Sequence, residues 1–103
     1  MKIAFLVYHD VLDDRVIRIL EELKIDAYTK WEQVIGKFHG SEGHLGTRTF
    51  PGHNSVRMIP FREDEVLQKL IEDLQEFNKE AVKKDDEIRL YLMPLEKIVW
   101  SFE

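Results

Sequence analysis

The stretch NSVRMIPFREDEVLQKLIEDLQEF, residues 54–77, decides the fold. Val56, Met58 and Ile59 predict a short strand, and we expect Pro60 to end it because proline has no N–H to donate to a central ladder. From Val66 to Phe77 the apolar residues recur at helical spacing, after a first turn of acidic residues that suits the positive end of a helix. The stretch therefore predicts one strand followed by one amphipathic helix.

The N-terminal third shows the same order and then adds a strand. The five apolar residues Ile3 to Val7 do not alternate with polar ones, which predicts a strand buried on both faces in the middle of a sheet. Leu12 to Leu23 has a helical apolar stripe, and Ala27 to Ile35 is rich in β-branched and aromatic residues, as strands are. This third therefore predicts β-α-β.

Near the C-terminus, the aliphatic residues Ile88, Leu90 and Leu92 alternate with Arg89, Tyr91 and Met93 before Pro94. This alternation predicts a last half-buried strand. The full order is β-α-β, a long loop, and β-α-β. That order predicts an α+β fold, a ferredoxin-like βαββαβ sandwich with an antiparallel four-stranded sheet and two helices on one face. We expect residues 1–103 to form a single domain, because a chain of 103 residues fits one compact core.

The segment from Gly36 to Asn54 holds all five glycines and three of the four histidines, and it has no sustained apolar period. Glycine makes turns easy, so the segment is expected to be one long loop. Loops of this length are uncommon in small domains and are usually functional.

Four large side chains, Trp31, Tyr91, Met93 and Trp100, are more than two helices can cover. An exposed patch of this kind usually marks an interface, which favours self-association. The alternative is that these residues belong to an ordinary core or are scattered singly over the surface.

Composition excludes several classes of function. The chain has 15 basic and 20 acidic residues and a net charge of -5, which disfavours nucleic acid as a partner. It has no cysteine, so disulfides and thiolate zinc sites are excluded. The run from Ile3 to Val7 is too short to span a bilayer, so we expect a cytoplasmic protein without direct membrane insertion. No nucleophile elbow or P-loop is present, which makes an enzyme the weaker class.

Several segments, in their order, resemble the PII nitrogen regulatory family over nearly the whole chain. Leu12-Asp13-Asp14 resembles the Leu-Asp-Asp that opens the family's first helix, and residues 24–29 stand where the family has Gly-Ile-x-Gly-Met-Thr. Gly36 falls where the family's T-loop begins. Residues 54–77 follow the family's spacing, and residues 88–96 are similar to its closing strand, which ends Pro-Val-Glu.

The resemblance implies a homotrimeric signalling protein with three sheets packed inward and a small effector, such as an adenine nucleotide, bound in clefts between subunits. The loop at 36–54 would be the T-loop equivalent that engages a partner protein, with membrane transporters the first to test. Carried over by position, Thr29 lies near the adenine, Gly36 lies at the loop base near the phosphates with Lys37 beside it, and Arg89 replaces a phosphate-binding lysine.

This chain also departs from the family. The family's second phosphate segment is rich in glycine, whereas residues 81–89 contain none whose backbone could approach a phosphate closely. Trp100 and Phe102 stand where the family has two basic residues near the C-terminus. These departures favour a divergent member whose ligand differs from tightly bound ATP.

The histidines of the loop suggest an alternative. His39, His44 and His53, with Glu42 among them, could hold a divalent metal such as zinc, nickel or copper if the loop folds around the ion. The protein would then be a metal-binding trimer that resembles the CutA proteins in fold. Two further interpretations stay open: the loop glycines and Arg48 could wrap an anion, or the histidines could simply be solvated.

Overall fold

The computed structural model describes residues 1–37, 43, 46 and 52–100. In chain order, the elements are β1 (Lys2–His9), the 3-10 turn η1 (Asp10–Leu12), α1 (Asp13–Glu22), β2 (Thr29–Val34), β3 (Asn54–Phe61), α2 (Asp64–Lys79), the 3-10 turn η2 (Lys84–Asp86) and β4 (Arg89–Pro94). Each strand and helix expected from the sequence is present, with ends that differ by a few residues.

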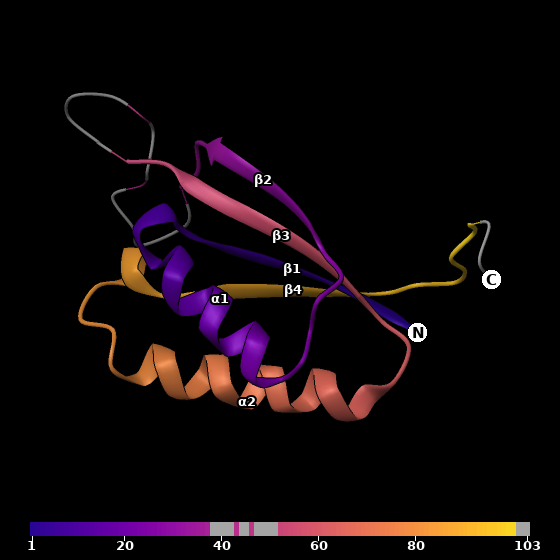
Figure 1. Ribbon diagram of the computed structural model, residues 1–103. Coiled ribbons are helices and arrows are strands. Elements are labelled where there is room, and N and C mark those ends of the chain that lie inside the picture. Colours follow the sequence, from indigo (N-terminus) through magenta and orange to yellow (C-terminus); the bar gives the residue numbers. More distant parts are fainter. Residues whose placement is uncertain (38–42, 44–45, 47–51, 101–103) are drawn as a thin grey trace.

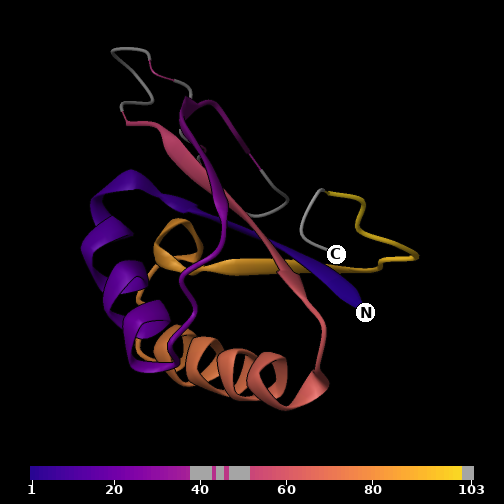
Figure 2. The ribbon, with the colours of Figure 1, turned by 45° about the vertical axis from the view of Figure 1, so that its right-hand side comes forward.

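The four strands form one sheet in the order β2-β3-β1-β4, and every neighbouring pair is antiparallel. Both helices cover the same face of this sheet (Figure 1), and the turned view in Figure 2 shows the other face without a helix. This arrangement confirms the predicted ferredoxin-like fold.

The core lies between the sheet and the two helices. β1 contributes Ala4, Leu6 and Tyr8, which alternate along the strand and are all buried. They meet the buried stripes of the helices, which consist of Val16 and Leu20 in α1 and Leu67, Leu70 and Leu74 in α2. The helical spacing read from the sequence therefore identifies the packed face of both helices.

β1 lies in the middle of the sheet, as expected, but only one of its faces is fully buried. Ile3, Phe5 and Val7 point to the face without helices and are partly exposed in a single chain. The prediction of burial on both faces is wrong for the isolated chain because both helices lie on the opposite face.

The expectation that Pro60 ends its strand is also wrong. β3 continues through Pro60 to Phe61, and Pro60 pairs with Ile3 of β1. The pairing with β2 reaches only as far as Met58, which lies opposite Thr29. β3 therefore has a neighbour on one side only at Pro60, where a missing N–H disrupts no ladder on the open side.

β2 is shorter than expected and irregular. Its pairs with β3 shift in register between Trp31 and Val34, so the strand carries an extra residue there. Gln33 lies in this bulge with a φ of 56°, a left-handed conformation that side chains other than glycine seldom adopt.

Candidate functional site

The face of the sheet without helices is named here the open face. It consists of Ile3, Phe5 and Val7 from β1, Val56 and Met58 from β3, Thr29 and Trp31 from β2, and Arg89, Tyr91 and Met93 from β4. Trp31, Tyr91 and Met93 are 45%, 49% and 47% exposed, as the sequence predicted for residues that the helices cannot cover. Trp100 is 59% exposed in the C-terminal tail. The open face is thus mostly apolar, with a single arginine at one edge.

Two of the predicted ligand-binding residues come together at one end of the sheet. Gly36 and Arg89 line a hollow of about 10 Å³, together with Val7, Tyr8, His9, Asn54, Asp85 and Glu87. The antiparallel register explains the meeting, because Val7 pairs with Arg89 on one side of β1 and His9 pairs with Asn54 on the other. This end of the sheet is also where the segment 36–54 leaves and re-enters the fold.

A side chain at position 36 would collide with Asn54. A Cβ atom there would lie 2.5 Å from Nδ2 of Asn54, which is closer than any stable contact between these atoms. Gly43 has a φ of 89°, and a side chain on it would press on Lys37 and on the carbonyl oxygen of Gly36. Lys37 itself is exposed beside these glycines. The base of the loop is therefore tightly packed around residues that the sequence had assigned to the ligand site.

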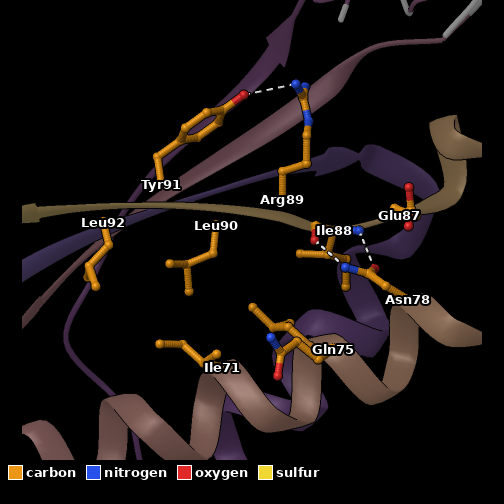
Figure 3. Close-up of a pocket in the computed structure, with 10 residues that line it drawn as sticks. Ile71, Gln75, Asn78, Glu87, Ile88, Arg89, Leu90, Tyr91 and Leu92 are labelled. Carbon is orange, nitrogen blue, oxygen red and sulfur yellow. Dashed lines mark hydrogen bonds between the residues drawn. The ribbon is translucent and has the colours of Figure 1, made fainter. Parts of the chain in front are cut away.

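Arg89 lies at the start of β4, where its guanidinium is held by Tyr91. Nη1 of Arg89 donates a hydrogen bond of 2.8 Å to the hydroxyl oxygen of Tyr91, as Figure 3 shows, and the guanidinium carbon lies 5.7 Å from the centroid of that ring. Because Arg89 and Tyr91 point to the same face of the strand, the charge lies over the edge of the open face.

Thr29 lies far from this pair. It belongs to β2, at one edge of the sheet, whereas Arg89 belongs to β4 at the other edge. With strand spacings of about 4.8 Å, the backbones of these two edges are about 14 Å apart. A single chain therefore does not bring Thr29 together with Gly36 and Arg89.

Of the three histidines predicted as metal ligands, His53 lies among the described residues. His39 and His44 lie outside the described residues, so the metal site remains a prediction. The carbonyl oxygen of His53 accepts a hydrogen bond of 3.0 Å from the N–H of Asp10, which fixes the end of the loop to the turn after β1. Within the part of the chain that the structure describes, no group of three or more histidine and acidic side chains could hold a metal ion.

A second polar cluster was not found from the sequence. Asp13, the first residue of α1, accepts hydrogen bonds from three strands: 2.5 Å from the hydroxyl of Tyr8, 3.0 Å from Nη2 of Arg57 and 2.9 Å from Nζ of Lys30. Arg57 is 2% exposed, and its Nε donates to the hydroxyl of Tyr8 at 2.9 Å. The guanidinium also stacks on the ring of Tyr28, 4.4 Å from its centroid.

The charges of this cluster stabilise one another. Burial alone would raise the pKa of Asp13, but hydrogen bonds from Tyr8, Lys30 and Arg57 lower it to about 2. Burial and the hydrogen bond to Asp13 raise the pKa of Tyr8 above its ordinary value. Burial alone would lower the pKa of Arg57, but contacts with Tyr8, Tyr28 and Asp13 raise it. No member of the cluster changes charge near pH 7, so the cluster suits fixing α1 to the sheet rather than proton transfer.

A wider groove runs between α2 and β4. It has a volume of about 490 Å³ and is lined by Ile71, Leu74, Gln75, Asn78 and residues 87–92. Figure 3 shows Leu90 and Leu92 pointing from the strand toward Ile71 on the helix. The side chain of Asn78 makes two hydrogen bonds with the backbone of Ile88, of 2.7 and 2.8 Å. Asn78 thus fixes the chain immediately before Arg89.

The order of the strands and the position of the helices define this protein as a ferredoxin-like α+β domain. Within that class, its fold is that of the PII-like proteins. CPII from Thiomonas intermedia K12, in its structure with ADP and bicarbonate, has a TM-score of 0.70 at 14% sequence identity, over 89% of this chain and 82% of CPII. The apo form of CPII gives 0.65 at 13% identity, over 89% and 85%.

A Thermus thermophilus protein that is assigned to the PII-like signalling class has a TM-score of 0.58 at 21% identity, over 89% of this chain and 82% of that one. No family model matches this sequence, and no curated protein is similar to it in sequence. The resemblance to PII proteins that the sequence predicted is thus confirmed at the level of the fold. Among the described residues, no helix is both long enough and apolar enough to span a membrane.

Proposed function

We propose that this chain is a PII-like regulatory protein that acts as a homotrimer. It binds a small effector, with an adenine nucleotide as the first choice, in clefts between subunits. The segment 36–54 engages a partner protein such as a membrane transporter. In this proposal the protein works in the cytoplasm and has no catalytic activity of its own.

The observation that carries the proposal is the position of the ligand-site residues on opposite edges of one sheet. Thr29 lies on the β2 edge, whereas Arg89 lies on the β4 edge, at the hollow that it shares with Gly36 at one end of the sheet. A head-to-tail contact that brings the β2 edge of one copy to the β4 edge of the next would join the two halves into one cleft. Repetition of such a contact closes a ring when the rotation allows it, and a ring of three is what the resemblance to PII proteins implies.

The open face supports the same assembly. Its apolar side chains cover the width of the sheet, and Trp31, Tyr91 and Met93 are each nearly half exposed in the single chain. Contiguous apolar surface of this kind is seldom left in water by a monomeric protein. Packing three open faces together would bury it.

The choice of effector follows from similar structures. CPII of Thiomonas intermedia K12 was solved with ADP, AMP and bicarbonate bound. The likeness of this chain to CPII lies in its fold, so adenine nucleotides are the first compounds to test. Arg89 supplies a cation where an anionic group of the ligand would lie.

Two measurements test the proposal. Light scattering after size exclusion should give about three times the chain mass of 12.3 kDa. AMP, ADP or ATP should raise the melting temperature, because a ligand that binds only the native state stabilises it. The shift should be lost in Arg89→Met and kept in the matched control Arg18→Met, which changes an exposed arginine on α1. A monomeric chain, or a protein whose melting no adenine nucleotide alters, would overturn the proposal.

A further inference from the structure

The hollow beside Gly36 contains more acid than a phosphate site should. η2 and the residue after it carry the consecutive acids Asp85, Asp86 and Glu87. Two of them, Asp85 and Glu87, line the same hollow of about 10 Å³ as Gly36 and Arg89. Both acids therefore lie at the end of the sheet where the strand of Arg89 begins, and their charges repel an anion that binds at this corner.

Asp85 also accepts a hydrogen bond from a backbone N–H group at the base of the loop. Its Oδ1 accepts a hydrogen bond of 3.4 Å from the N–H of Gly43, on the other side of the loop base. Gly43 packs against Lys37 and Gly36, so this donor belongs to the same corner of the fold. Backbone N–H groups of this kind bind phosphate in glycine-rich sites, whereas here a carboxylate of the protein is the acceptor.

The guanidinium of Arg89, the cationic group at this corner, is also hydrogen-bonded to another side chain. Arg89 donates to the hydroxyl of Tyr91, and the chain before it is fixed through Ile88 by Asn78 (Figure 3). Side chains, and not a flexible glycine-rich backbone, therefore set the position of the guanidinium. A guanidinium held in this way can bind one anionic group bidentately.

Coulomb's law sets the size of the acidic effect. One further negative charge on a ligand about 6 Å from a carboxylate weakens binding about threefold at the dielectric constant of water, and about a hundredfold at the effective value of about 20 that is typical near a protein surface. ATP carries two more negative charges than AMP. Two carboxylates at the hollow therefore penalise a triphosphate much more than a monophosphate.

We propose that the acids at the hollow select a ligand with a single phosphate group, a nucleoside monophosphate, over di- and triphosphates. The inference rests on the proposed function, because it takes an adenine nucleotide as the effector. Asp85 acts as an internal anion at the position where further phosphates would need backbone donors. Glu87 adds to the repulsion from the β4 side of the hollow.

Calorimetric titration of the full chain with AMP, ADP and ATP tests the inference, in a buffer with EDTA so that no divalent metal masks the phosphate charge. AMP should bind most tightly, and ATP should bind at least about tenfold more weakly. Asp85→Asn should narrow the ratio of the two affinities by about threefold or more, chiefly by improving ATP. Asp86→Asn is the matched control, because it removes the same charge from a neighbouring residue that does not line the hollow.

The outcomes are distinguishable. If the protein binds ATP as tightly as AMP, the charge selection is wrong while the proposed function stands. If no adenine nucleotide binds, the proposed function itself is overturned. If Asp85→Asn does not fold, Glu87→Gln tests the same repulsion from the other carboxylate. An affinity ratio that neither variant changes, or that Asp86→Asn changes as much, refutes the role given to the hollow.

Discussion

The cluster around Asp13 gives a prediction whose size follows from the structure. The carboxylate is 21% exposed and accepts hydrogen bonds from Tyr8, Lys30 and Arg57. Its pKa is about 2 in the folded protein, compared with an ordinary value of 3.8. Because the folded pKa is the lower one, the ionised cluster stabilises the fold above pH 3.8, and that stability is lost as the pH falls toward 2. The difference corresponds to about 2.5 kcal/mol at neutral pH.

Asp13→Asn should therefore lower the free energy of unfolding by about 2.5 kcal/mol at pH 7. The difference between the wild type and the variant should shrink below about pH 4, because the native carboxyl group also becomes neutral there. Urea unfolding at pH 7, 5, 4 and 3 measures it, at one fixed protein concentration because self-association would contribute to stability. Asp14→Asn is the matched control, since Asp14 is exposed in the same helical turn.

A loss of less than about 0.5 kcal/mol at pH 7 would refute the reasoning, because it would place the cluster with ordinary surface ion pairs. A loss that stays constant down to pH 3 would refute it differently. The effect of the substitution would then come from a change of packing and not from charge.

Three other substitutions test separate features. Trp31→Glu should raise the dissociation constant of the proposed trimer about a hundredfold or more, because the glutamate would be buried without a partner where the open faces meet. Light scattering measures this constant, and Val82→Glu, at a side chain 95% exposed, should leave it unchanged. Gln33→Gly should raise the free energy of unfolding by roughly 0.5–1 kcal/mol, because glycine adopts a positive φ without strain; a loss of stability in urea unfolding would contradict this. Asn78→Ala should lower the free energy of unfolding by about 2–4 kcal/mol, because two backbone groups of the buried Ile88 lose their hydrogen-bond partners. An unchanged urea midpoint would contradict this, because it would mean that water replaces both hydrogen bonds.

The sequence predicted the framework well because hydrophobic period is a local property. The helical stripe from Val66 to Phe77 lies within α2, and its leucines form the packed face. The excess of large side chains over what two helices can cover correctly indicated that Trp31, Tyr91 and Met93 would be exposed. Such arguments need only composition and spacing.

The polar cluster could not be predicted because β3 buries its arginine and leaves the flanking apolar residues partly exposed, the opposite of the usual pattern. Arg57 stands between Val56 and Met58, so alternation alone would point the arginine to solvent. In the structure the arginine faces the helices, and its apolar neighbours lie on the open face. The partners of Arg57 are Tyr8 in β1, Asp13 in α1 and Tyr28 just before β2. Their convergence depends on strand register, which no local pattern contains.

The residues predicted to bind a ligand are an intermediate case. Gly36 and Arg89 were assigned through resemblance alone, and the structure places them around one hollow. The acids that share the hollow could not be placed beside Gly36 from the sequence, because their proximity depends on how η2 meets the end of the sheet. The role of the histidines depends on His39 and His44, which lie outside the described residues.

The way the segment between Gly36 and His53 is attached has an evolutionary consequence. Gly36 lies against Asn54, and His53 is tied to the turn after β1, so the chain departs from and returns to neighbouring points. Doubling the length of such an excursion costs only about 0.6 kcal/mol in closure entropy. Insertions, deletions and replacements in this segment therefore cost little stability during evolution, because they leave the pairing of the four strands unchanged.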